Sequence, residues 1–168
     1  MKQLNNLNEI LAYHLEAAYV AEKKIQKVLP ASLPAIGHKK LAATFKKYLE
    51  SSSDKRMKLK RMFGYLLVRP QSRKCKPVVG ILDQMTAIVR SESACELRDV
   101  QLLGALLSLT RYKSSLYITA KLYSSALELN TVSALVNEVA GWENETYETL
   151  LKISSEGILQ EAGEVGVA

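Results

Sequence analysis

The chain has 168 residues, of which 48% are hydrophobic and 24% are charged, and its formal net charge is +6. This composition is ordinary for one globular domain with a full core, and no run of about 18 apolar residues predicts a membrane-spanning helix. The two cysteines, Cys75 and Cys95, form neither a disulfide framework nor a metal-ligand spacing. We therefore expect reduced thiols and a cytoplasmic protein without a membrane partner.

The charge is unevenly distributed along the chain. Residues 39–76 hold thirteen Lys and Arg against two acidic residues, a local net charge of +11, whereas residues 128–168 hold eight Glu against one Lys, a local net charge of −7. Such segments can pair within the chain, pair between the subunits of a homodimer, or leave the basic segment free for a polyanion. The sequence leaves these three arrangements open.

Apolar residues recur every three or four positions in the first half of the chain, which predicts amphipathic helices. We expect a first helix over residues 4–29 and a second over residues 38–66. Pro30, Pro34 and Gly37 separate them. A basic loop follows, and then a short helix over residues 77–89, in which Pro77 suits the first turn.

The same periodicity predicts two helices in the second half, over residues 95–127 and 130–155. A single domain then spans residues 1–156, and residues 157–168 are expected to form a flexible C-terminal tail. The link between the second and third long helices, 67–93, is too long for a simple hairpin. The fold class is therefore all-α, and we expect a ferritin-like four-helix bundle with a short extra helix in the crossover between long helices two and three.

Three charged residues interrupt the apolar stripes of these helices. Glu22 lies four residues after Ala18, Lys113 lies seven after Leu106, and Glu143 lies on the buried side of the last helix. Lys55 flanks the stripe of the second helix. Because an isolated charge is costly to bury, each of these residues needs a partner.

Three short motifs resemble the YciE/YciF family of ferritin-like proteins. Tyr19-Val20-Ala21-Glu22-Lys23-Lys24 is similar to that family's Y-x-A-E-K-Q, Lys74-Cys75 with Gly80-Ile81 to its K-C-x-x-M-x-G-L, and Glu96-Leu97-Arg98-Asp99 to its E-V-R-D. The resemblance covers roughly residues 7–155. It implies a ferritin-like fold with a structural or stress-associated role.

The positions that resemble the family's metal-binding helices have changed in this chain. The second helix of the family reads H-x-x-E-T-x-x-Q, and these positions are here occupied by Tyr48, Ser51, Ser52 and Lys55. The V-E-H-Y-E of its third long helix is replaced by Leu109, Thr110, Arg111, Tyr112 and Lys113. The resemblance therefore implies vestigial metal ligands at Glu22 and Glu143 only.

A di-metal centre in such a bundle needs about four carboxylates and two histidines that project inward. This chain has two histidines, His14 and His38, and neither belongs to an E-x-x-H pair. Cations at Lys55, Arg111 and Lys113 would repel a divalent ion. We therefore predict no metal and no cofactor. In their place we expect an ion-pair core of Glu22, Lys113 and Glu143, with Arg111 and Lys55 as further donors.

The leading functional hypothesis is a non-enzymatic ferritin-like protein of structural or stress-associated role. One alternative is a di-metal oxidase of iron or manganese, or a metal-handling protein. Another is a bundle that binds DNA or another polyanion weakly and without sequence specificity through residues 39–76. The sequence carries no phosphate-binding glycine loop and no nucleophile–base pair, so it predicts no catalytic residue and no small-molecule substrate. We expect a homodimer.

Overall fold

The computed structural model describes residues 3–71 and 75–165, and all regular secondary structure in these ranges is helical. Four long helices and one shorter helix are present, and their bounds are close to the predicted ones. They are α1 (Leu7–Val28), α2 (Lys39–Tyr65), α3 (Lys76–Arg90), α4 (Cys95–Ala126) and α5 (Asn130–Ile153). Two short 3-10 turns, Leu29–Ala31 and Leu33–Ala35, join α1 to α2. Within the described residues, no helix is long and apolar enough to cross a membrane.

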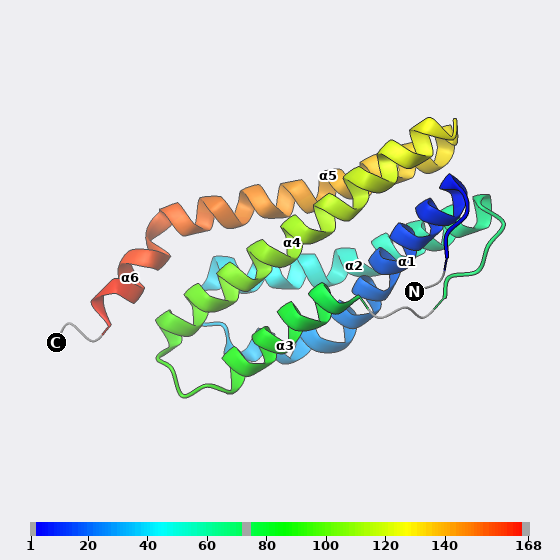
Figure 1. The fold of residues 1–168 in the computed structure, drawn as a ribbon. Helices are drawn as coiled ribbons and strands as arrows, with labels where there is room; N and C mark the ends of the chain where they lie inside the picture. Colours follow the sequence, from blue (N-terminus) through cyan, green and yellow to red (C-terminus); the bar gives the residue numbers. More distant parts are fainter. Residues whose placement is uncertain (1–2, 72–74, 166–168) are drawn as a thin grey trace.

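The four long helices form a bundle with a crossover connection (Figure 1). The helices α1 and α2 make one antiparallel hairpin, and α4 and α5 make another. Because α2 and α4 run in the same direction, the chain returns along the length of the bundle between them, and α3 lies in this return and packs against α1 and α4. The predicted bundle with a short helix in the crossover is confirmed.

Side chains at the helix ends fix how the elements join. Asn6 begins α1, because its side chain accepts the N–H of Glu9 at 2.9 Å while the Glu9 carboxylate accepts the N–H of Asn5 at 3.0 Å. The Asp99 carboxylate in α4 accepts the N–H groups of Gly37 and His38 at 3.2 and 2.7 Å, immediately before α2 begins. This contact ties the α1–α2 turn to the first turns of α4.

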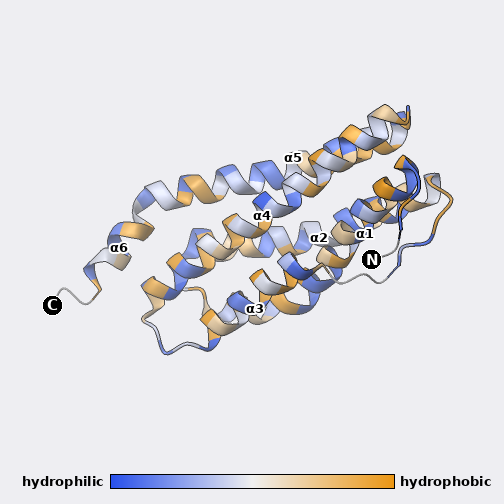
Figure 2. Cartoon of the chain, in the orientation of Figure 1, coloured by the Kyte–Doolittle hydropathy of each residue, from blue (hydrophilic) through white to orange (hydrophobic). Residues whose placement is uncertain are grey.

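The apolar core consists of two clusters, as expected of helices with the amphipathic patterning visible in Figure 2. One cluster, which includes Ile25, Phe45 and Leu106, joins α3 to the bundle. The other, which includes Leu15, Phe63 and Val136, lies toward the α4–α5 turn. On every long helix a buried polar residue lies at the boundary between the two clusters. The bundle therefore holds a polar layer at mid-length.

The segment after α5 differs from the predicted tail. A wide turn over Ser154–Ile158, in which Gly157 takes a φ of 111°, leads into a further helix, α6 (Leu159–Glu164). Ile158 and Ala162 are buried, and α6 contacts α4. These two apolar residues lie four apart on one helical face, which gives α6 a surface to bury. Only residues 166–168 of the predicted tail lie outside the described residues.

Candidate functional site: a buried ion cluster

Each long helix contributes one charged side chain to the polar layer. They are Glu22 from α1, Lys55 from α2, Lys113 from α4 and Glu143 from α5, and each is 0% exposed. Three buried hydroxyl residues, Tyr48, Ser52 and Tyr117, surround them. We call these seven residues the ion cluster. Their positions follow from the helical repeat, since each charged residue lies in line with buried residues of its own helix. Lys55, expected beside the apolar stripe of α2, lies on it, between the buried Ser52 and Leu59.

The charged groups of the ion cluster are in direct contact. The Nζ of Lys113 lies 2.5 Å from Oε1 of Glu22 and 2.6 Å from Oε1 of Glu143. The Nζ of Lys55 lies 2.8 Å from the same Glu143 oxygen. Two ammonium groups therefore face two carboxylates, and the formal charge of the cluster is zero. This balance is what burial demands, because an uncompensated charge would cost several kcal/mol.

Hydroxyl groups occupy the remaining acceptor positions of the carboxylates. Glu22 accepts hydrogen bonds from Ser52 at 2.7 Å and from Tyr117 at 3.0 Å. Glu143 accepts one from Tyr48 at 3.0 Å, and the Tyr48 oxygen accepts one from Lys113 at 3.0 Å. Every carboxylate oxygen thus has a donor, which makes the cluster a connected and satisfied network.

The tyrosine ring also contributes to the binding of the cations. The ammonium of Lys55 lies 4.4 Å from the centroid of the Tyr48 ring, and that of Lys113 lies 4.8 Å from it. A cation at this range is attracted by the ring quadrupole, and the attraction is larger away from water. Tyr48 therefore contacts both lysines through its ring, and it also binds Lys113 through its hydroxyl.

The two lysines respond differently to the same surroundings. Burial acts to lower the pKa of Lys113, but the Glu143 and Glu22 carboxylates outweigh it, and the pKa is raised. The pKa of Lys55 is lowered, because burial and the nearby Lys113 charge outweigh the two carboxylates. Lys113 is consequently the firmly charged centre of the cluster.

The acidic and phenolic groups shift in the directions that this charge pattern requires. Burial acts to raise the pKa of Glu143, but Lys113 and Lys55 outweigh it and the pKa is lowered. The pKa values of Tyr48 and Tyr117 rise well above the usual value, first because of burial and then because of the adjacent carboxylates. The tyrosines are therefore neutral hydrogen-bond donors.

The structure brings together four of the five residues expected in the ion-pair core. Glu22, Lys55, Lys113 and Glu143 meet, whereas Arg111 does not. Arg111 is exposed, and its guanidinium carbon lies 3.7 Å from the centroid of the Tyr147 ring. The reason is the helical repeat: two residues along α4 rotate a side chain by about 200°, so Arg111 and Lys113 face opposite sides.

The sequence did not assign Tyr48, Ser52 and Tyr117 to the site. Their spacing carried a signal, since Tyr48 and Ser52 precede Lys55 by seven and three residues and Tyr117 follows Lys113 by four. These intervals place side chains on one helical face. The identity of the carboxylate that each hydroxyl reaches depends on the packing of separate helices.

The residues of the ion cluster do not fit a di-metal centre. Its two carboxylates are already bound by ammonium and hydroxyl donors, and two lysines stand where neutral or acidic ligands would be needed. His14 packs edge-on against Tyr123, and His38 accepts the N–H of Leu41 at the start of α2. Across residues 3–71 and 75–165, no group of three or more His, Cys, Asp or Glu could hold a metal ion.

Lysine and glutamate also pair on the surface where α2 faces α5 and the following turn. Lys47 contacts Glu145, Lys58 contacts Glu138, and Lys40 contacts Glu156, each at 2.7 Å. We call these the surface ion pairs. They show that part of the basic segment 39–76 is paired with the acidic segment of the same chain.

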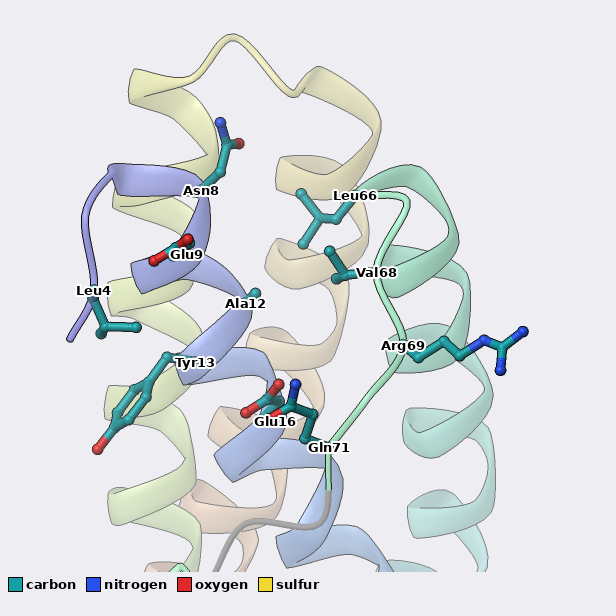
Figure 3. Close-up of a pocket in the computed structure, with 10 residues that line it drawn as sticks. All are labelled: Leu4, Asn8, Glu9, Ala12, Tyr13, Glu16, Leu66, Val68, Arg69 and Gln71. Atoms are coloured by element: carbon teal, nitrogen blue, oxygen red, sulfur yellow. The ribbon is translucent and has the colours of Figure 1, made fainter. Parts of the chain in front are cut away.

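A cavity of about 410 Å³ lies between α1 and the segment that follows α2 (Figure 3). Leu66 and Val68 point into it, whereas Arg69 points away. Its described lining also includes Tyr13 and Glu16 on α1, but no His, Cys or Ser. It contains no residue of the ion cluster.

A bundle with this crossover, with polar side chains projecting inward from all four long helices, defines the ferritin-like class. The crystal structure of the Escherichia coli stress protein YciF matches with a TM-score of 0.88 at 19% identity, covering 94% of this chain and 99% of that one. YcfI of Rhodopseudomonas palustris, provisionally described as a structural protein, matches with a TM-score of 0.84 at 17% identity, covering 89% and 95% of the two chains. The ferritin-like fold is thereby confirmed.

The chain belongs to the DUF892 family, a domain of unknown function whose model matches residues 6–163. Protein YciF of E. coli strain K12 is 22% identical over 155 residues, which cover 85% of this chain and 87% of that protein. The resemblance noted from the three sequence motifs is confirmed. One of them has a structural explanation, because Arg98 donates from Nε to the carbonyl of Ala35 at 3.0 Å, beside the Asp99 contacts with the same turn.

Proposed function

We propose that this chain is a non-enzymatic, ferritin-like structural protein in which the ion cluster stands in place of a metal centre. The observation that carries the proposal is that two carboxylates and two ammonium groups bind one another at 0% exposure. In such a site the two ammonium groups neutralise the two carboxylates, so no metal ion is needed to balance their charge. The cluster then serves the stability and register of the bundle.

The same observation argues against catalysis at this level of the bundle. A substrate must touch the reacting groups, and the charged atoms of the cluster are closed to solvent and occupied by one another. No cofactor is required by this arrangement. A stress-associated role is the biological context we propose, and its support is the description of the E. coli relative as a stress protein.

The test is the metal content of the protein purified without chelator and then incubated aerobically with ferrous and manganous salts. We expect substoichiometric iron, manganese and zinc after gel filtration, and no oxygen consumption above that of the salt alone. The matched variant is Glu22→Gln, which removes one carboxylate of the cluster. Two metal ions per chain in the wild type, and their loss in Glu22→Gln, would contradict the proposal and favour the di-metal alternative.

Polyanion binding through residues 39–76 is a weaker proposal for this chain. The surface ion pairs occupy Lys40, Lys47 and Lys58, which reduces the free positive charge of that segment. We expect weak DNA binding that falls steeply with salt and does not depend on sequence. Sequence-selective binding at physiological salt in a fluorescence anisotropy titration would contradict this expectation and would favour DNA binding as the main function.

A further inference from the structure

The C-terminal end of α2 carries a leucine in a conformation that favours glycine. Leu67 has a φ of 54°, and it is held there because its N–H donates to the carbonyl of Gly64 at 3.1 Å while that of Val68 donates to Phe63 at 3.2 Å. Gly or Asn usually occupies this position of a helix cap. The Leu67 side chain is 93% exposed, so it gains no burial in return. Contact with a docking partner would bury this side chain.

The neighbours of Leu67 are aromatic and basic. Tyr65 is 51% exposed, and Arg61 and Arg69 are exposed on either side of it in sequence. No Asp or Glu occurs between Asp54 and Asp83. We call Arg61, Tyr65, Leu67 and Arg69 the basic tip.

Three acidic residues lie near the same end of the bundle. Glu9 and Glu16 on α1 line the same cavity as Arg69, and Glu128 lies in the turn after α4. Glu9 already binds the N–H of Asn5 in the cap of α1, and none of the three belongs to the segment that carries the basic tip. The tip therefore presents an exposed apolar residue between cations.

The opposite end of the bundle has the complementary character. A shallow hollow of about 380 Å³ lies between the start of α4 and α6, lined by Glu96, Glu161, Glu164 and Val165. Two exposed leucines lie close to these residues in sequence. Leu97 directly follows Glu96 and is 37% exposed, and Leu159 lies two residues before Glu161 and is 50% exposed. We call this surface the acidic hollow.

We propose that the basic tip of one copy of this chain docks on the acidic hollow of a second copy. Each surface supplies exposed apolar side chains, and their charges are opposite, so contact would bury apolar area and pair cations with carboxylates. The two surfaces lie at opposite ends of the bundle (Figure 1), so one chain cannot bring them together. The contact is heterologous, with a different surface on each partner.

The first experiment is sedimentation velocity over a concentration series of the full chain at low and high salt. We expect reversible association of the wild type that weakens as salt rises, because the paired charges are screened. Leu67→Gly should lower the association constant about tenfold or more, as expected for the loss of one buried leucine side chain. This substitution suits the cap conformation, so its thermal unfolding should show that the variant is folded.

The second experiment mixes two variants, each with one surface altered. Leu67→Gly combined with Arg69→Glu disables the tip, and Glu161→Gln combined with Glu164→Gln disables the hollow. Each should be monomeric alone, and their mixture should form a dimer through the one intact tip and the one intact hollow. The control is Leu122→Ser, which removes a leucine that is 64% exposed on α4 and should leave association unchanged.

Three outcomes would overturn the proposal. They are a wild type that is monomeric at every concentration, association that both altered surfaces leave intact, and a mixture of the two variants that stays monomeric. Binding of the basic tip to DNA or to anionic vesicles in place of a second copy would also overturn it.

Discussion

The chain makes the same lysine–glutamate contact in two different surroundings. In the ion cluster, Lys113 and Glu143 lie 2.6 Å apart and both are 0% exposed. On the surface, Lys47 and Glu145 lie 2.7 Å apart, but their side chains are 75% and 60% exposed. The distances are nearly equal, so distance does not distinguish the two pairs. Water does, because it solvates either partner of the surface pair when the other is removed and cannot reach the buried one.

Lys113→Met should have the largest effect on stability. It leaves Glu22 and Glu143 buried with only Lys55 to balance them, and breaking a buried pair in this way typically costs about 3–5 kcal/mol. Urea unfolding monitored by circular dichroism measures the loss. A change below about 1 kcal/mol, as for an exposed pair, would show that the ion cluster is open to water.

A second substitution should recover much of this loss. In Lys113→Met with Glu22→Gln, one carboxylate and one ammonium are removed together, so Glu143 and Lys55 remain as a neutral pair. The amide oxygen that Glu22→Gln introduces can still accept the hydrogen bond from Tyr117, and the amide N–H group can donate to the Ser52 hydroxyl, which also donates to the Glu22 backbone carbonyl in the wild type. If the double variant is less stable than Lys113→Met, charge balance is not what the cluster provides.

Lys55→Met should cost less than Lys113→Met, about 3 kcal/mol, at the lower end of the range for a broken buried pair. Lys55 contacts one carboxylate, whereas Lys113 contacts two. Burial and the nearby charge of Lys113 both lower the pKa of Lys55, and removal of Lys55 also removes the repulsion between the two ammonium groups. The difference between the two variants in urea unfolding tests the ranking, and a larger loss for Lys55→Met would reverse our assignment of the central cation.

Acid should destabilise the protein through Glu143. Because the pKa of Glu143 is lowered below its ordinary value of 4.5 in the folded state, its contribution is present above 4.5 and is lost as the pH falls through the folded pKa. One such group changes the unfolding free energy by at most about 1.4 kcal/mol per pH unit. Urea unfolding measured from neutral pH down to about pH 3 should show this fall.

The control for the acid effect is Glu156→Gln. The pKa of Glu156 is also lowered, first by its hydrogen bond from Lys40, but this carboxylate is exposed and should contribute little. The acid transition of Glu156→Gln should therefore match that of the wild type. If it removes most of the acid sensitivity, the surface pairs and not the buried cluster govern stability in this pH range.

The smallest effects should come from the surface ion pairs. Lys47→Met should change the unfolding free energy by less than about 0.5 kcal/mol, and high salt should abolish the change. Lys58→Met should cost somewhat more, up to about 1 kcal/mol, because Lys58 is only 19% exposed and lies over the Trp142 ring. Equal effects for Lys47→Met and Lys113→Met would remove the distinction between the two settings.

Local patterning in the sequence was enough to predict the helices and the bundle. The repeat of apolar residues set the five helices before α6, and the length of the link between α2 and α4 required a crossover. The same repeat identified Glu22, Lys113 and Glu143 as inward charges, because a charge on an apolar stripe must face the core. Arg111 was misplaced, since its position two residues from Lys113 turns it to the opposite face.

The pairing of these charges was decided only by the tertiary structure. A helical repeat tells which face a side chain occupies, but not which atom of another helix lies opposite it. The choice of Lys55 as the second cation, the donation from Tyr48 to Glu143 and the pairing of α2 with α5 all depend on how four separate helices are aligned. Burial of α6 depended on the same alignment. Ile158 and Ala162 are buried where α6 contacts α4, a helix that is distant from them in sequence. The sequence by itself therefore determined the helices and the inward charges, and long-range packing determined which of those charges bind one another.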